Sequence, residues 1–127
     1  AEIISEFDLS CFVYDYDHNA PDAEYLRKTH EPFFKIIREK RPDLPVVFVS
    51  MCSFHSRTEM IERREIIKKT YLNAIKAGDK NVAFVDGELL FGTEDRDACT
   101  VDGLHPNDLG FYRMSKVIGK EVSKWVK

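Results

Sequence analysis

The sequence lacks any Gly-x-Ser-x-Gly segment in its 127 residues, and so it lacks the sharp turn that usually presents a catalytic serine. Cysteine is scarce as well. Cys11, Cys52 and Cys99 are an odd number without Cys-x-x-Cys spacing, which argues against a disulfide scaffold or a zinc knuckle. Buried free thiols are the simplest interpretation of these residues.

Neither a large net charge nor a long apolar run is present. The formal charge is -3 with acids and bases interspersed, which gives no reason to expect binding to nucleic acid or to a membrane surface. The longest apolar runs are far shorter than a bilayer requires, and no charged-then-apolar leader opens the chain. Because a leader can be removed from a mature protein, the compartment stays open, with a secreted or periplasmic parent among the alternatives.

Three short runs of β-prone residues predict strands. They cover residues 11–14, 46–49 and 82–85, and polar or turn-forming residues follow each of them. The run Val46-Val47-Phe48-Val49 is apolar throughout, as expected of a strand that is covered on both faces in a parallel sheet.

Helical patterns follow the first two strands. The first contains Pro32, which predicts a kink or a restart near Thr29, and Pro42 stops it. The second opens with the capping box Ser56-Arg57-Thr58-Glu59, and Gly78 is placed to close it. The expected apolar faces are Tyr25, Leu26, Phe33, Phe34, Ile36 and Ile37 in the first helix and Met60, Ile67, Tyr71, Leu72 and Ile75 in the second, where Glu62, Arg63, Lys68 and Lys69 form a solvated face.

A third helix, capped by Asn107 or Asp108, completes the order β-α-β-α-β-loop-α. This order predicts a single α/β domain over residues 1–127, with a parallel sheet between helices. The carboxyl ends of all its strands meet at one edge, where polar residues gather as they do in an active-site rim and in strand-to-helix loops generally. The expected core face of the third helix is Phe111, Met114, Ile118, Val122 and Trp125.

The segment from Val101 to Gly110 places a carboxylate and an imidazole three residues apart, directly before this helix. Asp102 and His105 bracket a tight glycine-containing loop, so one short segment can carry a general base and the group that orients it. An imidazole titrates near neutral pH, and a carboxylate can hold its tautomer and stabilise the imidazolium. The alternative is a histidine that caps the helix beside an acid that binds backbone amides.

The run from Asp102 through His105-Pro106 to Gly110, with a helix behind it, resembles the last sequence block of the SGNH (GDSL-type) hydrolases. The stretch Asp15-Tyr16-Asp17-His18-Asn19-Ala20-Pro21 is similar to the block that supplies an oxyanion-hole asparagine in one branch of that family. Residues 29–50 also resemble this branch. The resemblance implies an ester hydrolase with a flavodoxin-like three-layer α/β/α fold and no metal or organic cofactor. Its members act on acyl esters, often on acetyl groups of sugars.

The resemblance also implies roles for individual residues. His105 would be the general base, Asp102 the group that orients it, and Asn19 a donor to the oxyanion. The alternative for Asn19 is an asparagine that is simply tolerated at a turn. His18 and His55 are candidate substrate contacts or solvated loop histidines.

No nucleophile is assigned, since Ser50 and Cys52 follow a strand without the glycine spacing of a nucleophile turn. In complete family members the serine follows the first strand and a glycine donor follows the second, and no Gly-Asp-Ser-Leu-like segment occurs in this sequence. Residues 1–7 are expected to be a helical tail leading into the third strand. We therefore expect the C-terminal portion of an SGNH domain, with its sheet truncated to about three strands.

Two functions stay open at this point. In the first, the chain supplies Asp102, His105 and Asn19 to a serine ester hydrolase, an acyl or acetyl esterase with carbohydrate esters among its substrates, and is inactive without the serine. In the second, a non-catalytic flavodoxin-type module binds a small ligand or a metal at the carboxyl edge of the sheet. Asp102 and His105 could supply two metal ligands, but the sequence places no clear third.

The expected truncation has a consequence for self-association. It would leave the strand Cys11–Tyr14 as a sheet edge with unpaired N–H and C=O groups, which is a template for pairing with another chain. We therefore expect a homodimer through this edge or its flanking helices. The alternative is a monomer in which residues 1–10 fold over the edge.

Overall fold

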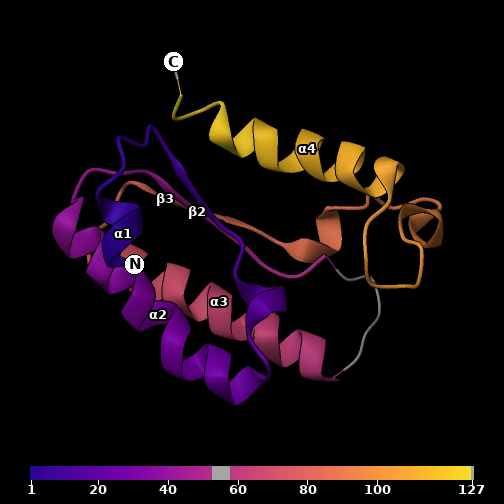
Figure 1. Ribbon diagram of the computed structural model, residues 1–127, viewed down its shortest axis with the longest axis horizontal. Coiled ribbons are helices and arrows are strands. Elements are labelled where there is room, and N and C mark those ends of the chain that lie inside the picture. The colour runs from indigo at the N-terminus through magenta and orange to yellow at the C-terminus, as the bar shows by residue number, and fades with distance from the viewer. Residues whose placement is uncertain (53–57, 127) are drawn as a thin grey trace.

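The computed structural model describes residues 1–52 and 58–126 (Figure 1). Its α-helices, strands and 3-10 helices follow one another in this order: α1 (Glu2–Ser5), β1 (Phe12–Tyr14), η1 (Asp17–Asn19), α2 (Ala23–Lys40), β2 (Val46–Val49), α3 (Thr58–Lys76), β3 (Val82–Val85), η2 (Gly87–Leu89), η3 (Arg96–Cys99) and α4 (Asp108–Val122). The expected helical tail at residues 1–7 is present as the single short helix α1.

The three strands form one parallel sheet in the order β1-β2-β3, with Phe12 opposite Val46 and Val46 opposite Val82. Helices α2 and α3 pack together on one face of the sheet, and α4 covers the other face (Figure 1). The structure therefore confirms the three-layer α/β/α fold with a three-stranded parallel sheet. None of the described helices is long and apolar enough to cross a membrane.

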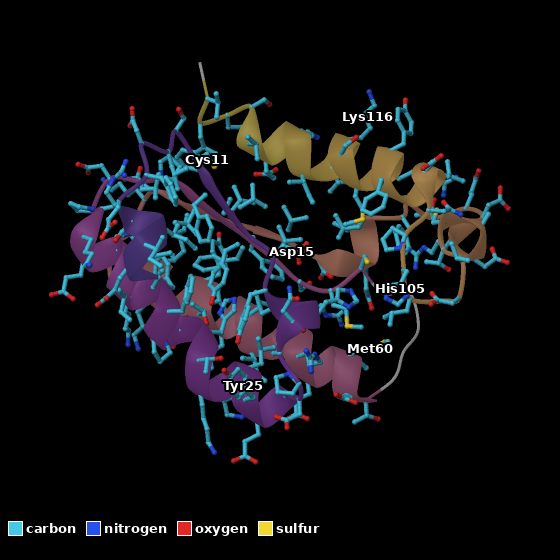
Figure 2. The ribbon with its side chains drawn as sticks, in the orientation of Figure 1. Cys11, Asp15, Tyr25, Met60, His105 and Lys116 are labelled. Carbon is cyan, nitrogen blue, oxygen red and sulfur yellow. The ribbon has the colours of Figure 1, made fainter. Side chains whose placement is uncertain are left out.

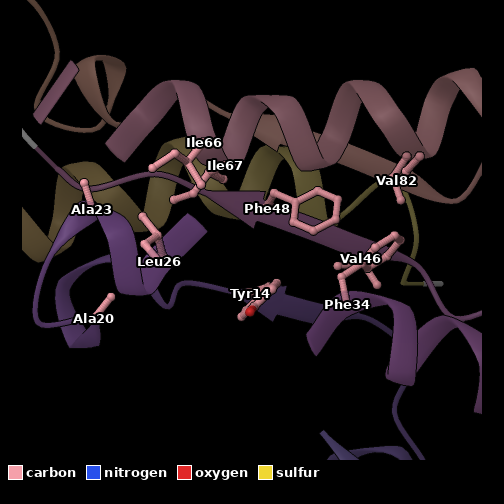
Figure 3. Packing of buried hydrophobic residues seen from close by; sticks show 11 residues of the cluster. Tyr14, Ala20, Ala23, Leu26, Phe34, Val46, Phe48, Ile66, Ile67 and Val82 are labelled. Carbon is pink, nitrogen blue, oxygen red and sulfur yellow. The ribbon is translucent and has the colours of Figure 1, made fainter. Parts of the chain in front are cut away.

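The core consists of two apolar layers on either side of β2, whose four residues are all buried. On the α2–α3 side Phe48 is fully buried and meets the edge of the Phe34 ring at 4.9 Å between centroids (Figure 3). On the other side Val47 and Val49 lie under partly buried residues of α4. Each large apolar side chain removed from water in this way stabilises the fold by about 1.5–3 kcal/mol.

Helix α2 runs as one helix through Pro32, so of the expected kink or restart near Thr29 the restart was wrong. His30 and Phe34, on either side of the proline, are both buried against the sheet, and this packing outweighs the hydrogen bond that proline cannot donate. The helix begins at the cap Asp22, whose side chain accepts the Tyr25 N–H at 2.7 Å, and it ends at Lys40. The predicted stop before Pro42 is confirmed.

Helix α3 ends as expected, but only part of its expected apolar face, including Ile67 and Tyr71, lies inward. The N–H groups of Gly78 (φ +88°) and Asp79 donate to carbonyls of the last turn, so Gly78 closes the helix. Leu72 and Ile75 are 52% and 44% exposed, so their assignment to the core was wrong. Ser56 and Arg57 of the capping box lie outside the described residues. The buried residues of α3 are Arg63, Ile66, Ile67, Thr70 and Ala74.

Helix α4 is capped by Asn107, whose side chain accepts the Gly110 N–H at 3.1 Å. Met114, Ile118, Val122 and Trp125 pack on the sheet as expected, with Val117 beside them. Phe111 is 59% exposed, so its placement in the core was wrong. In the first turn of α4 Gly110 lies against the Cys99 carbonyl of η3, while Phe111 points to solvent.

Candidate active site

The parallel strands bring their carboxyl ends to one edge of the sheet, which holds η1 after β1, residues 50–52 after β2, and η2 after β3. The 102–105 loop precedes α4 and follows Cys99, which packs in one apolar cluster with Cys52 after β2, and Figure 2 shows His105 to the right of Asp15. This edge is where open α/β sheets generally bind their ligands.

Asp102 and His105 are in direct contact. His105 Nδ1 lies 2.6 Å from Asp102 Oδ2, while Asp102 Oδ1 accepts the backbone N–H groups of His105 at 2.8 Å and Leu104 at 3.0 Å. The His105 N–H, then the imidazole, and then the Leu104 N–H hold the pKa of Asp102 well below its usual range. The carboxylate thus engages Nδ1 of the ring and leaves Nε2 for proton transfer.

The backbone of this loop is closed on itself. Gly103 has a φ of +81°, and its N–H donates to Thr100 Oγ1 at 3.1 Å. The Val101 N–H donates to the His105 carbonyl at 3.1 Å, and Thr100 forms an isolated antiparallel bridge with Pro106. The pair is therefore fixed by the local sequence, although both side chains are more than half exposed.

The start of helix α4 joins the 102–105 loop to η3. The Asn107 N–H donates to the Cys99 carbonyl at 3.0 Å, and its side-chain amide donates to Ala98 O at 2.8 Å. Gly110 comes so close that a Cβ at this position would lie 2.3 Å from the Cys99 carbonyl oxygen. Asn107 therefore both caps α4 and anchors the His105 loop to η3.

Residues His18 and Asn19 lie in η1 and are exposed. The Asn19 N–H donates to Tyr16 O at 3.0 Å, which keeps the turn closed and leaves the side-chain amide on the surface. Within the described residues, no hydrogen bond joins η1 to Asp102 or His105. His55 lies outside the described residues.

Ser50 and Cys52, to which the sequence assigned no nucleophilic role, are both buried. Ser50 is 1% exposed, and its Oγ accepts the Gly87 N–H at 2.8 Å. Cys52 is 6% exposed and its Sγ lies 3.6 Å from His18 Nε2. Burial, reinforced by Asp15, raises the pKa of the Cys52 thiol to about 11, so it stays protonated at neutral pH.

Arg63 is the residue that sequence reasoning missed. It was assigned to the solvated face of α3, yet it is 6% exposed and its Nε donates to Asp17 Oδ1 at 2.8 Å. Its spacing of three, four and seven residues from Ile66, Ile67 and Thr70 places it on the buried face of α3 and was the available signal. Charge alone suggested solvent, because arginine is rarely buried unless it is paired.

A cavity of about 640 Å³ lies between the C-terminal ends of α2 and α3, beside the segments that lead into β2 and β3. Several polar residues of its lining pair with one another. Arg38 donates to Asp79 at 2.7 Å. Glu31 accepts a hydrogen bond from the Asn73 amide at 2.8 Å and forms an ion pair with Lys35 at 2.8 Å. Since it opens at the amino ends of the strands, this cavity is separate from the candidate site.

Within residues 1–52 and 58–126, no three His, Cys, Asp or Glu side chains are grouped closely enough to hold a metal ion. The metal-binding alternative therefore finds no third ligand beside Asp102 and His105 in that part of the chain.

Residues 1–123 match the model of the GDSL-like Lipase/Acylhydrolase family. The chain belongs to this family. Among solved structures it is similar to a protein described as a GDSL-like lipase from Bacteroides ovatus, with a TM-score of 0.81 and 30% identity over 97% of this chain. The chain spans 38% of that protein's length. No curated protein matches the chain.

Two further solved structures share the fold of this GDSL-like chain at lower identity. One is the salicylyl-acyltransferase SsfX3 from a tetracycline biosynthetic pathway, with a TM-score of 0.73 and 19% identity over 96% of this chain and 39% of that one. The other is a family two carbohydrate esterase from Clostridium thermocellum, with a TM-score of 0.75 and 16% identity over 96% of this chain and 38% of that one.

Proposed function

We propose that this chain supplies the general base, its orienting acid and an oxyanion donor to a serine ester hydrolase whose nucleophile lies outside these 127 residues. The observation that carries the proposal is the 2.6 Å contact between His105 Nδ1 and Asp102 Oδ2, in a loop that the backbone holds closed. Membership of the GDSL-like family supports the reaction class. The burial of Ser50 and Cys52 supports a nucleophile from elsewhere.

The reaction would proceed through an acyl-enzyme. The serine Oγ attacks the ester carbonyl while His105 Nε2 takes its proton, and Asp102 stabilises the imidazolium that forms. The Asn19 side-chain amide donates to the oxygen that becomes negative in the tetrahedral intermediate. His105 returns the proton to the leaving alcohol, and it then activates the water that releases the acid.

The proposed substrates are acyl esters, with acetyl groups on carbohydrates as the first class to examine. The shared fold of a carbohydrate esterase supports this choice. An exposed His105, in a loop at the open edge of the sheet, also allows a bulky alcohol such as a sugar to approach. His18 and His55 are proposed to contact this alcohol.

The test requires a polypeptide that joins this chain to its serine-bearing segment. With p-nitrophenyl acetate, His105→Ala should abolish measurable turnover, because loss of a triad member costs about 10⁴-fold or more in kcat. Asn19→Ala should lower kcat by about 10²–10³-fold. Asp102→Asn should be severely impaired, whereas Asp97→Asn, which changes an exposed acid of η3, should not be. A fully active His105→Ala variant would overturn the proposal.

A further inference from the structure

The guanidinium of Arg63 donates hydrogen bonds to the turn that contains Asn19. Its Nε donates to Asp17 Oδ1 at 2.8 Å, and one terminal nitrogen donates to the carbonyls of Asp17 and of Ala20, the latter at 2.8 Å. The other terminal nitrogen lies 3.6 Å from the exposed carboxylate of Glu59. The side chains of Asp17 and Arg63 are 0% and 7% exposed, so this contact is made away from water.

Asp17 extends this contact to the next loop. Its second oxygen, Oδ2, accepts the Met51 N–H at 2.9 Å, so the carboxylate joins α3, the turn after β1 and the end of β2. Both oxygens of the buried carboxylate are therefore used. A buried ion pair adds little net stability compared with apolar packing, whereas it specifies geometry when every polar atom is satisfied.

Asn19 lies between Asp17 and Ala20, the two residues whose carbonyls Arg63 binds. Its N–H donates to Tyr16 O at 3.0 Å and the Ala20 N–H donates to Asp17 O at 3.2 Å, which closes the turn on the protein side. Asn19 itself is exposed, while Asp17 before it and Ala20 after it are buried. The turn is thus a fixed support for the exposed Asn19 at the carboxyl edge of the sheet.

We propose that Arg63 and Asp17 are positioning residues that hold the Asn19 amide where the oxyanion forms. This inference rests on the proposed role of Asn19. An oxyanion donor contributes through preorganisation, and a displacement of about 1 Å can cost about 10²-fold in rate. A rigid turn under the donor supplies that preorganisation, and the turn is held by a buried residue of α3.

The geometry requires arginine and not merely a positive charge. The planar fork of Arg63 serves one carboxylate oxygen and two carbonyls at once, whereas the ammonium of lysine is a compact point charge on a flexible stem. Arg63→Lys therefore keeps the positive charge but cannot make all of these hydrogen bonds at once. Arg64→Lys is the matched control, because Arg64 pairs with Asp86 and Glu88 near β3 and not with η1.

Hydrogen exchange in the chain as it stands tests the structural half of the proposal. In Arg63→Lys, the N–H groups of Asn19 and Ala20 should exchange about tenfold faster or more, relative to the amides of β2, than in the wild type. Arg64→Lys should leave this ratio unchanged. Asp17→Asn replaces the carboxylate by a neutral amide of the same shape. It is the second variant, to be used if Arg63→Lys does not fold. Unchanged exchange of Asn19 and Ala20 in both Arg63→Lys and Asp17→Asn would overturn the proposal.

A double-mutant cycle in the serine-containing polypeptide tests the catalytic half. Arg63→Lys should lower kcat by about 10–100-fold with little change in KM, and should cost much less once Asn19 is alanine. An equal loss in both backgrounds would mean that Arg63 acts independently of Asn19 and would overturn the positioning role. Full activity of Asn19→Ala would instead overturn the proposed role of Asn19, which separates the two failures.

Discussion

Asp102 holds His105 through the side chain and the backbone at once. Oδ2 lies 2.6 Å from the imidazole Nδ1, and Oδ1 accepts the N–H of His105 at 2.8 Å. Because the Leu104 N–H also donates to Oδ1, the carboxylate orientation does not depend on the histidine ring. The acid is therefore preorganised before a proton moves, which is the property that an orienting acid requires.

This arrangement predicts how Asp102 titrates. Its pKa should be well below the usual range in the wild type and should rise in His105→Ala, because one of its three hydrogen bonds is lost. It should still stay below the usual value, since the backbone N–H groups of residues 104 and 105 remain. A ¹³C NMR titration of the carboxyl group measures this, with His18→Ala as the control. An ordinary Asp102 titration in the wild type would contradict the observed contacts.

The two glycines of α4 should respond in opposite ways to alanine. At Gly110 a Cβ would lie 2.3 Å from Cys99 O, so Gly110→Ala should destabilise the fold and shift the His105 loop. At Gly119 a Cβ would meet nothing within 4 Å, so Gly119→Ala should stabilise by about 0.5–1 kcal/mol. Urea unfolding of both variants measures the difference. Equal effects of the two substitutions would show that Gly110 does not touch η3.

The sequence predicted the strands and the parallel sheet because their signals are local. The apolar run of β2 and the polar residues after each strand needed no tertiary information. It also predicted the Asp102–His105 contact, since the two residues are three apart in a tight loop, where Gly103 adopts the positive φ that the turn needs.

The predictions that failed depend on contacts between residues far apart in the sequence. Arg63 is buried because a carboxylate 46 residues earlier in the chain meets it, and nothing local to α3 reports that partner. Leu72 and Ile75 fit the helical period as well as Ile66 and Ala74 do, and only the direction of the sheet decides between these faces. Pro32 is tolerated inside α2 because the packing of residues on either side of it overrides a local rule.

Buried His30 predicts a loss of stability in mild acid. Its ring is stacked on Tyr14 at 4.4 Å, its Nδ1 bonds Thr70 Oγ1 at 2.9 Å, and burial lowers its pKa from 6.5 to about 4. Between these two values the unfolded chain binds the proton more readily than the fold does, so stability falls as the pH falls from 6.5 to about 4. The contribution lost reaches about 3 kcal/mol at most.

Urea unfolding of the wild type and of His30→Gln over this pH range isolates the effect, because glutamine does not titrate. The wild type should lose more stability than His30→Gln between the two pKa values. Parallel pH curves for the two proteins would show that His30 is solvated or already charged in the fold.

The homodimer expected from the sequence stays a prediction, and the structure supplies its test. Within the described residues β1 is an edge strand of the sheet, and Val13 on it is 36% exposed. A dimer through this edge should give twice the chain's 14.8 kDa in light scattering at micromolar concentration. Val13→Lys should convert it to a monomer, whereas Val101→Lys, in the loop before α4, should not. A monodisperse wild-type monomer would refute the dimer.

Our central proposal is that these 127 residues supply the general base of an ester hydrolase and that the nucleophile comes from elsewhere. Hydrolysis of p-nitrophenyl acetate by the chain alone, compared with its His105→Ala variant, tests this most directly. We predict the same background rate for both, since a His–Asp pair without a serine can at most activate water. Robust turnover that disappears in His105→Ala would contradict it, and would place a working nucleophile within the chain.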